Sequence, residues 1–315
     1  MKTSTTGIWH RCIVSATDSL LPQGAADRIR ALVRKRRAAR ERARLEWWDV
    51  RSAKGTGTTV IELRKGVRMR LHFGGALSRL IFRGDFEVAE RKFLEAYLKP
   101  GDVFVDVGAN LGLYALLAAH AVGPRGRVHA FEPYAEACDR LRMNVSLNGF
   151  QNIQVHPVAL SDRAGLTSIH LAEPGRDAWN SLAAGSVRES GGRETVVART
   201  WDEFAAANDL AGNVTFMKID VEGWEVPVLR GGRGLLSQPN APVLQVEFTD
   251  AAADGAGYSC QMLYRLLEEY GYRLYRFDYA TNRLELEPLQ PAYPYTNLLA
   301  VKDPATVQAR LITTP

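Results

Sequence analysis

Apolar runs of strand length alternate with helical patterns along the chain after residue 100. This alternation predicts a parallel sheet with helices on both faces. We therefore expect a doubly wound α/β fold with a mostly parallel, seven-stranded sheet, whose last two strands form a hairpin-like pair. The expected strands are Val103–Val107, Arg127–Phe131, Ile153–Val158, Val214–Ile219, Val243–Phe248, Arg273–Asp278 and Asn297–Val301, and the expected helices include Leu111–Val122, Ala135–Asn148 and Met262–Tyr270.

The chain before residue 100 has a different pattern. Two β-rich runs around a compact turn predict a hairpin, and a later stretch with helical spacing predicts a helix that a Pro-Gly pair ends. These segments are Thr58–Leu63 and Val67–Phe73 around Arg64-Lys65-Gly66, and Phe86–Leu98 before Pro100-Gly101. We expect three parts: a basic helical extension over residues 1–55, a hairpin and helix layer over 56–100, and the doubly wound domain over 101–315.

Two features interrupt or restart the alternation in the second half. Glu173–Gly192 is rich in Pro and Gly at its ends, which indicates a loop insertion. Thr200-Trp201-Asp202-Glu203 has the spacing of a capping box, which predicts the start of a helix.

Basic residues are concentrated between Arg28 and Arg44, in a chain with a net charge of +5. One interpretation is an arm that binds nucleic acid or an anionic membrane surface. We favour the other, a solvated helix with Ile29, Leu32 and Val33 on its inner side, because charge runs are commonly exposed faces. The rest of the chain is close to neutral or acidic, so we expect no nucleic-acid partner and at most a weak peripheral membrane contact. The basic residues are Arg28, Arg30, Arg34, Lys35, Arg36, Arg37, Arg40, Arg42 and Arg44.

The bulk composition is that of a globular protein, and 315 residues can bury a sizeable core. No stretch provides the roughly 20 apolar residues of a transmembrane helix, and no apolar core with a cleavage site follows Met1–Ser4. Cys12, Cys138 and Cys260 form neither a CxxC pair nor an even disulfide set. We therefore expect a protein of the reducing cytosol, and the sequence leaves its oligomeric state open.

The first strand of the expected sheet runs into the glycine-rich segment Asp106–Gly112 and then into a helix. Such a turn lets the backbone approach a ligand and directs helix N-terminal amides at it. Asn110 stands where a dinucleotide fingerprint has its second glycine, and Leu113 where it has its third, so pyrophosphate binding is disfavoured. The loop with Asp106, Gly108, Asn110 and Gly112 suits a smaller ligand. Asp106 could accept hydrogen bonds from an ammonium group of that ligand.

Glu132 ends the second strand, in Phe131-Glu132-Pro133. A carboxylate at this place can accept both ribose hydroxyls of a nucleoside. The alternative is that the glycines only form a tight turn and that the acids are surface charges. We favour nucleoside binding because Asp106, the loop and Glu132 occur in the correct order.

Several of these segments resemble S-adenosylmethionine-dependent class I methyltransferases, and within them the FkbM-type family. Asp106–Gly112 and Phe131–Pro133 resemble the first class I motifs, and Met217–Glu225 with Val228–Gly231 resembles the FkbM signature. Two further segments, Ala159–Asp162 and Asn180–Leu182, are also similar to that family, and the resemblance runs from about Phe82 to Val301.

The resemblance implies a Rossmann-like class I methyltransferase fold and S-adenosyl-L-methionine as the cofactor. It adds Ala159 and Leu160 to the cofactor-binding residues, beside the loop and Glu132. Glu87 matches a position where the family often has an acid, so we expect it either to close over the cofactor or to cap a helix.

The strand before Asp220 departs from the apolar pattern of a buried parallel strand. Period-two alternation places Lys218 and Asp220 on one face, and burying such charges is costly unless they pair or serve a ligand. Glu222 follows in the turn, and Glu247 ends the next strand at a comparable position. Since open α/β sheets bind ligands at the carboxyl ends of their strands, we expect these groups at the site.

Three carboxylates at one rim indicate either a general base or a cation site. We expect Asp220 to be the base that takes the proton of a hydroxyl acceptor, with Glu222 and Glu247 as acceptor clamps and Lys218 as a neutralising or orienting group. The alternative for Lys218 and Asp220 is a structural ion pair. A divalent metal on Asp220, Glu222 and Glu247 is a further alternative that we favour less, because no His joins them at ligand-like spacing.

Taken together, these features favour an O-methyltransferase that acts on a hydroxyl of a glycan, glycolipid or polyketide-like small molecule. The oxygen acceptor is implied mainly by the resemblance. The alternatives are an N-methyltransferase and a non-catalytic S-adenosylmethionine-binding scaffold or regulatory module; a nicotinamide dehydrogenase is disfavoured by Asn110. Two weaker site candidates are His156, which precedes Pro157 near a strand end, and Trp179, which could stack on a sugar.

Overall fold

A computed structural model describes residues 23–173, 180–183 and 192–312. Contacts between residues divide the chain into two units, Met1–Thr56 and Gly57–Pro315. No helix among the described residues is both long enough and apolar enough to cross a membrane.

The described part of the first unit contains one long helix, α2 (Gln23–Ser52). The side chains of the basic run that the structure describes are exposed, as expected. The prediction that Ile29, Leu32 and Val33 lie on an inner side of this helix is wrong for Leu32 and Val33, which are 50% and 42% exposed. The side chain of Ile29 is outside the described part of the chain. Charged residues surround both positions along the helix, so an apolar stripe never forms.

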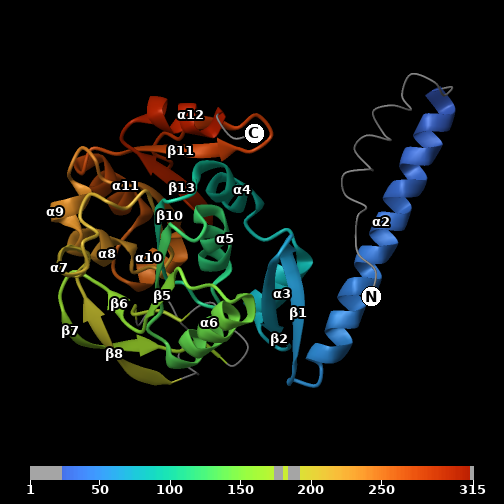
Figure 1. Cartoon of the computed structure of the whole chain (residues 1–315), viewed down its shortest axis with the longest axis horizontal. Coiled ribbons are helices and arrows are strands. Elements are labelled where there is room, and N and C mark those ends of the chain that lie inside the picture. Colours follow the sequence, from blue (N-terminus) through green and yellow to red (C-terminus); the bar gives the residue numbers. More distant parts are fainter. Residues whose placement is uncertain (1–22, 174–179, 184–191, 313–315) are drawn as a thin grey trace. The chain divides into compact units, whose positions relative to one another are not determined.

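The second unit is built on an eight-stranded sheet in the order β12-β11-β13-β10-β9-β3-β4-β5 (Figure 1). β10, β9, β3, β4 and β5 are parallel neighbours, whereas β13, β11 and β12 add antiparallel pairs at one edge. This is the expected doubly wound, mostly parallel fold class. The strands are β3 (Val103–Val107), β4 (Arg127–Phe131), β5 (Ile153–His156), β9 (Phe216–Ile219), β10 (Val243–Phe248), β11 (Arg273–Asp278), β12 (Arg283–Leu286) and β13 (Thr296–Val301).

The sheet has one strand more than the seven expected. All seven predicted strands belong to it, and the additional one is β12, which pairs with β11 at the outer edge. β12 is short and largely exposed. Its alternation, Arg283-Leu284-Glu285-Leu286, spans only four residues, the shortest run for which alternation indicates a strand.

Helices cover both faces of the large sheet, with α8 and α11 on one side and α4 and α5 on the other (Figure 1). On the α4 and α5 side, Phe93 packs edge-on against Phe216 with ring centres 5.4 Å apart. The helices of the unit are α3 (Ala76–Arg83), α4 (Val88–Tyr97), α5 (Leu113–Val122), α6 (Ala135–Asn148), α7 (Trp201–Ala207), α8 (Glu225–Gly231), α9 (Arg233–Leu236), α10 (Asp250–Gly255), α11 (Cys260–Glu269) and α12 (Pro304–Ile312).

The predicted hairpin is present as β1 (Thr58–Arg64) and β2 (Val67–His72). It docks on α6 through side-chain amides: Asn144 Oδ1 accepts from the Arg70 amide and Asn148 Oδ1 from the Arg68 amide, both at 2.7 Å. The helix α3 after the hairpin was not expected from the sequence. Its eight residues follow a Gly-Gly pair, and Leu77, Leu80 and Ile81 have helical spacing over only about two turns.

A small three-stranded sheet flanks the predicted loop insertion. Its order is β6-β8-β7, from β6 (Ala159–Leu160), β7 (Gly165–His170) and β8 (Arg193–Arg199). The insertion is therefore the connection between two antiparallel strands, β7 and β8. After it, Thr200 caps α7 as predicted, with Thr200 Oγ1 accepting from the Glu203 amide at 3.2 Å.

Candidate cofactor and acceptor site

A cavity of about 760 Å³ lies at the carboxyl ends of the central parallel strands. Its volume falls within the range of roughly 300–1,000 Å³ that small-molecule sites occupy. The cavity lining includes eleven of the twelve residues that the sequence assigned to the site: Glu87, Asp106, Gly108, Asn110, Glu132, Ala159, Leu160, Lys218, Asp220, Glu222 and Glu247.

Gly112 is the predicted site residue that does not line this cavity. A Cβ at Gly112 would lie 2.3 Å from Leu141 Cδ1 of α6. The glycine therefore allows α5 to begin against α6, and its assignment to direct cofactor contact is not supported by its position.

Asp106 is buried at the end of β3, on the face of the sheet that α4 and α5 cover. Its side chain is 1% exposed, and its Oδ2 has no hydrogen-bond partner within the described part of the chain. Burial raises the pKa of Asp106 to about 6, although the nearby Lys218 charge opposes this rise. A buried acceptor without a donor is costly, which indicates a group that receives its donor from a ligand.

Gly108 brings the cofactor loop against the end of β9. It has a φ of 82°, and a Cβ there would lie 1.8 Å from the carbonyl oxygen of Asp220. The glycine is thus required for the approach of two protein backbones. This contact joins the Asp106–Gly112 loop directly to Asp220.

Glu132 fixes the loop by accepting backbone amides from both sides. Its Oε2 accepts from the Asn110 amide at 2.8 Å, and its Oε1 from the Tyr134 amide at 2.9 Å. Burial raises the pKa of Glu132 to about 7, although these two hydrogen bonds lower it. Each carboxylate oxygen keeps a lone pair for a further donor.

The end of the cavity where we expect the acceptor, here called the acceptor end, is built by alternation on two neighbouring strands. Val246 and Phe248 pack into the core cluster on one face of β10, so Gln245 and Glu247 lie on the other. Lys218 lies on that same face of β9, beside Gln245 in the parallel register. The period-two prediction for Lys218 and Asp220 is confirmed, because Lys218 Nζ donates to Asp220 Oδ2 at 2.5 Å.

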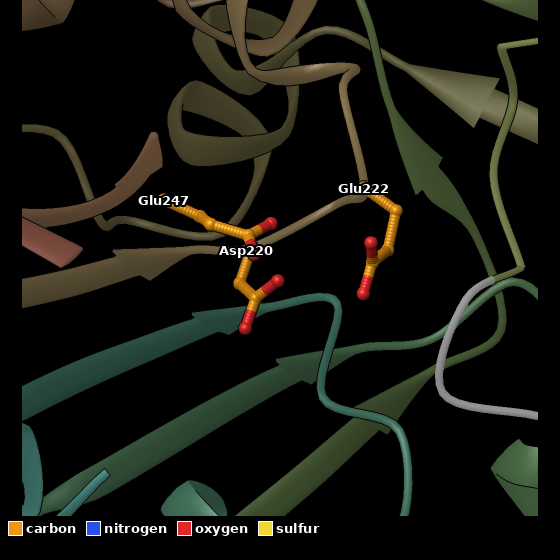
Figure 2. A group of neighbouring side chains, drawn as sticks. All are labelled: Asp220, Glu222 and Glu247. Carbon is orange, nitrogen blue, oxygen red and sulfur yellow. The ribbon is translucent and has the colours of Figure 1, made fainter. Parts of the chain in front are cut away.

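Asp220, Glu222 and Glu247 come together at this end, as Figure 2 shows. One carboxylate oxygen from each lies within 4.8 Å of those of the other two. Burial, together with the repulsion between these charges, raises the pKa of both Glu222 and Glu247 well above the usual range. Burial alone lowers the pKa of Lys218, but the surrounding acids Asp220, Glu87 and Asp106 outweigh it and raise that pKa above its usual value.

Glu225, which received no role in the sequence interpretation, holds the turn that presents Glu222. Its Oε1 accepts from the amides of Val221 and Gly223, at 3.0 and 3.3 Å. Glu222 itself has a φ of 53°, in the left-handed region. The sequence feature that could have identified Glu225 is its position in the same motif, three residues after Glu222.

Glu87 is the N-cap residue of α4, but its side chain makes no capping hydrogen bond. Its carboxylate instead accepts from Tyr114 Oη at 2.7 Å, Tyr295 Oη at 2.9 Å and Asn297 Nδ2 at 3.1 Å. Tyr295 comes from the far end of the chain, and no sequence pattern connected these donors to Glu87. They fix its carboxylate at the cavity wall.

The other motif segments also meet at the site. Ser181 Oγ donates to the backbone oxygen of Glu222 at 2.7 Å, and Trp224 Nε1 donates to Ser161 Oγ at 3.1 Å. His156 does not face this cavity; it lines a separate one of about 300 Å³ beside Phe204. Its Nε2 lies 3.1 Å from His129 Nδ1. Trp179 lies outside the described residues.

Known proteins with sequence similarity to this chain include two methyltransferases. The 31-O-demethyl-FK506 methyltransferase FkbM of Streptomyces tacrolimicus is 44% identical over 69 residues, 22% of this chain and 26% of that protein. The hexuronic acid methyltransferase AglP of Haloferax volcanii is 29% identical over 164 residues, 52% of this chain and 63% of that protein. The chain therefore matches less than two thirds of the length of either relative.

Solved structures with a similar arrangement include a methyltransferase FkbM from Methylobacillus flagellatus KT. It is 16% identical, with a TM-score of 0.39, over 71% of this chain and 54% of that one. A precorrin-6y C5,15-methyltransferase from Geobacter metallireducens GS-15 is 14% identical, with a TM-score of 0.40, over 69% and 88%. The family model of the methyltransferase FkbM domain matches residues 106–274, which is more than half of the 315 residues. The chain belongs to the FkbM methyltransferase family.

Proposed function

We propose that this protein transfers the methyl group of S-adenosylmethionine to a hydroxyl oxygen of a glycan, glycolipid or polyketide-like small molecule. The observation that carries the proposal is a single cavity that joins the Asp106–Gly112 loop and Glu132 to three clustered carboxylates. A nucleoside-sized ligand at the loop would place its reactive end toward Asp220.

The chain's own residues fit this cofactor. The buried Asp106 Oδ2 lacks a donor in the described part of the chain, and the cofactor's ammonium group would supply one. Glu132 would accept the ribose hydroxyls while it keeps the Asn110 amide in place. Ala159 and Leu160 add buried, apolar residues to the cavity lining.

The acceptor end fits transfer to an oxygen. Bound S-adenosylmethionine would supply an electrophilic methyl group: the acceptor oxygen forms a bond to the methyl carbon while the carbon–sulfur bond breaks, leaving S-adenosylhomocysteine. Asp220 takes the proton of the hydroxyl, and Glu222 and Glu247 hold the acceptor by accepting from its other hydroxyls. Lys218 stays protonated beside Asp220 and limits the build-up of negative charge.

The names of the relatives support an oxygen acceptor. One is named for methylation at an oxygen of FK506 and the other for methylation of a hexuronic acid. These names describe those proteins, and they guide the choice of acceptors for this one.

The experiment that tests the proposal is transfer of an isotopically labelled methyl group from S-adenosylmethionine to a panel of acceptors. The panel would contain uronic-acid oligosaccharides, a glycolipid, a macrolide with a free hydroxyl and matched amines. We expect label on an oxygen of at least one hydroxyl acceptor. Label on nitrogen alone would contradict the proposal, and S-adenosylhomocysteine that fails to bind in calorimetry would remove the cofactor assignment as well.

A further inference from the structure

The three carboxylates at the acceptor end have the spacing of ligands around one ion. Their closest oxygens lie within 4.8 Å of one another. Two oxygens on opposite sides of Ca²⁺ are roughly 4.6–5.2 Å apart, and on opposite sides of Mg²⁺ roughly 4.0–4.2 Å, from their usual bond lengths. The side chains extend from three separate backbone positions into one shared space (Figure 2).

A second observation, independent of the clustering, comes from Glu247. Its side chain is only 6% exposed and lines the cavity. Thr249 Oγ1 donates to Glu247 Oε1 at 3.1 Å, but Glu247 Oε2 has no hydrogen-bond partner among the described residues. A buried carboxylate oxygen without a partner is costly, and an ion would remove that cost.

The charges around the group leave it short of positive charge. Lys218 pairs with Asp220, and its Nζ also lies 4.6 Å from the centre of the Tyr114 ring. Within the described chain, no ion pair joins Lys218 or an arginine to Glu222 or Glu247. With all three carboxyl groups ionised, one ammonium group would face three negative charges, so a bound cation of charge two would balance the cluster.

We propose that Asp220, Glu222 and Glu247 form a binding site for one divalent, oxygen-preferring cation such as Mg²⁺, Mn²⁺ or Ca²⁺. The donor set contains carboxylate oxygens without Cys or His, which selects this class of ion over zinc or copper. The absence of a His, for which we favoured a metal less in the sequence, does not count against such an ion, because hard cations need no imidazole ligand.

This proposal rests on the proposed function and narrows its substrate class. Three protein oxygens leave coordination positions open on a cation that takes six or more ligands. An acceptor with two adjacent oxygens, such as a vicinal diol or a hydroxyl beside a carboxylate, could occupy two of them. The ion would then replace the direct hydrogen bonds of Glu222 and Glu247 to the acceptor. It would hold the reacting hydroxyl at the end of the cavity nearest Gly108, which abuts the carbonyl oxygen of Asp220.

The first test measures binding of Mn²⁺ to the full-length protein by electron paramagnetic resonance, in which bound Mn²⁺ loses the signal of the free ion. We expect one bound ion per chain that Mg²⁺ or Ca²⁺ displaces. Glu247→Gln and Glu222→Gln should each lower the affinity by at least about tenfold. The matched control is Glu90→Gln, which changes another acid of the same cavity outside the cluster and should keep wild-type affinity.

Melting curves show whether each variant is folded, and Glu222→Gln carries the test if Glu247→Gln is not. No bound Mn²⁺ at about 1 mM, a weak limit for such sites, would overturn the proposal. The same affinity in all variants would overturn it too, because the ion would then bind elsewhere.

A second test separates this proposal from the proposed function. With a chelator present, S-adenosylhomocysteine should still bind in calorimetry, while methyl transfer to a diol acceptor should fall and return when Mg²⁺ is added. Undiminished transfer in the chelator would refute the cation site and leave the methyltransferase intact. Absence of cofactor binding and of transfer under every condition would instead refute the proposed function.

Discussion

Carboxyl groups held by backbone amides organise the cavity at the scale of single residues. Glu132 binds the amides of Asn110 and Tyr134, and Glu225 binds those of Val221 and Gly223. Each acid therefore fixes a loop and at the same time shapes the space where a ligand would lie. Replacing them separates these two effects only if the substitution keeps the hydrogen-bond acceptor.

The first residue-scale prediction concerns Gly108→Ala. A methyl group there would collide with the Asp220 carbonyl oxygen at 1.8 Å, so the free energy of unfolding should fall by about 1–3 kcal/mol, as for overpacked sites. Cofactor affinity should fall with it. Chemical denaturation and calorimetry measure the two effects.

Gly101→Ala is the matched control for that prediction. Gly101 also has a positive φ, of 95°, but no atom lies within 4 Å of the Cβ that alanine would add. The backbone strain is therefore shared, and the difference between the two variants reports the contact with Asp220. Equal effects would show that this contact does not matter.

A second prediction uses the pKa of Glu132. Because burial raises this pKa to about 7, the carboxyl group is partly protonated near neutrality, and ribose hydroxyls bind better to its ionised form. The affinity for S-adenosylhomocysteine should therefore rise between about pH 6 and 8. In Glu132→Gln the affinity should be lower and this part of the rise should be absent.

The stability of the ligand-free protein should change in the opposite direction. The folded-state pKa of Glu132 lies above its usual value of 4.5, so folded protein binds the proton more tightly than unfolded protein. The contribution of this group to stability is present below pH 4.5 and is lost as the pH rises through about 7. If affinity and stability rose together across this range, Glu132 would not be the titrating group.

A third prediction separates the chemical and structural roles of Asp220. Asp220→Asn keeps the size of the side chain but removes its charge, so turnover should fall by about 10²–10⁴, the range for losing a general base. Cofactor affinity should be preserved, because the loop and Glu132 carry it. A methyl-transfer assay and calorimetry on one preparation provide both numbers.

The control for Asp220→Asn addresses its ion pair with the buried Lys218. Leaving a buried ammonium group without its partner costs about 3–5 kcal/mol. The double variant Lys218→Met with Asp220→Asn should recover stability without recovering turnover. Recovery of both would make Asp220 a structural residue.

At the scale of elements, the turn between β9 and α8 determines where Glu222 points. Its backbone combines a non-glycine residue at a φ of 53° with Gly223 at 97°. Both hydrogen bonds that hold it end on one oxygen, Oε1 of Glu225. The orientation of one acceptor-side carboxylate thus depends on the first residue of the next helix.

The prediction at this scale compares Glu225→Gln with Glu225→Ala. Glutamine keeps an Oε1 acceptor, so the turn and the turnover should be largely retained. Alanine leaves the half-buried Val221 amide and the buried Gly223 amide without acceptors, at a cost of up to about 1–3 kcal/mol each, and should displace Glu222 and lower turnover. Melting curves and the methyl-transfer assay distinguish the two variants; similar behaviour would show that the turn holds without Glu225.

At the scale of the whole molecule, the candidate site lies within one of the two units. Every residue that lines the main cavity lies within Gly57–Pro315, whereas the basic run belongs to Met1–Thr56. The described side chains of that run are exposed on α2. Exposure fits a solvated helix. That the basic run binds neither nucleic acid nor a membrane stays a prediction.

We expect the intact protein to bind little to anionic vesicles or nucleic acid at physiological salt, since an exposed basic helix without an apolar stripe has only screened electrostatic attraction. Co-sedimentation with vesicles and a filter-binding assay measure this, with residues 57–315 as the matched control. Strong, salt-sensitive binding that the shorter chain lacks would establish the run as a binding arm.

The features that depend on near neighbours along the chain could be predicted from the sequence alone. The strand and helix alternation, the glycine loop after Asp106, the cap at Thr200 and the placement of Lys218 and Asp220 on one face all follow from local periods and spacings. The edge strand β12 was not predicted, because its alternation spans only four residues and most of them are exposed.

The contacts between residues far apart in the sequence could be identified only from the fold. It brought Glu247 to Asp220 and Glu222, packed Gly108 on the carbonyl of Asp220, and placed Tyr295 and Asn297 on Glu87, more than two hundred residues away. These contacts depend on the order of the strands in the sheet and on how its helices pack. Neither is encoded in the spacing of residues within a segment, because both are set by the pairing of segments across the whole domain.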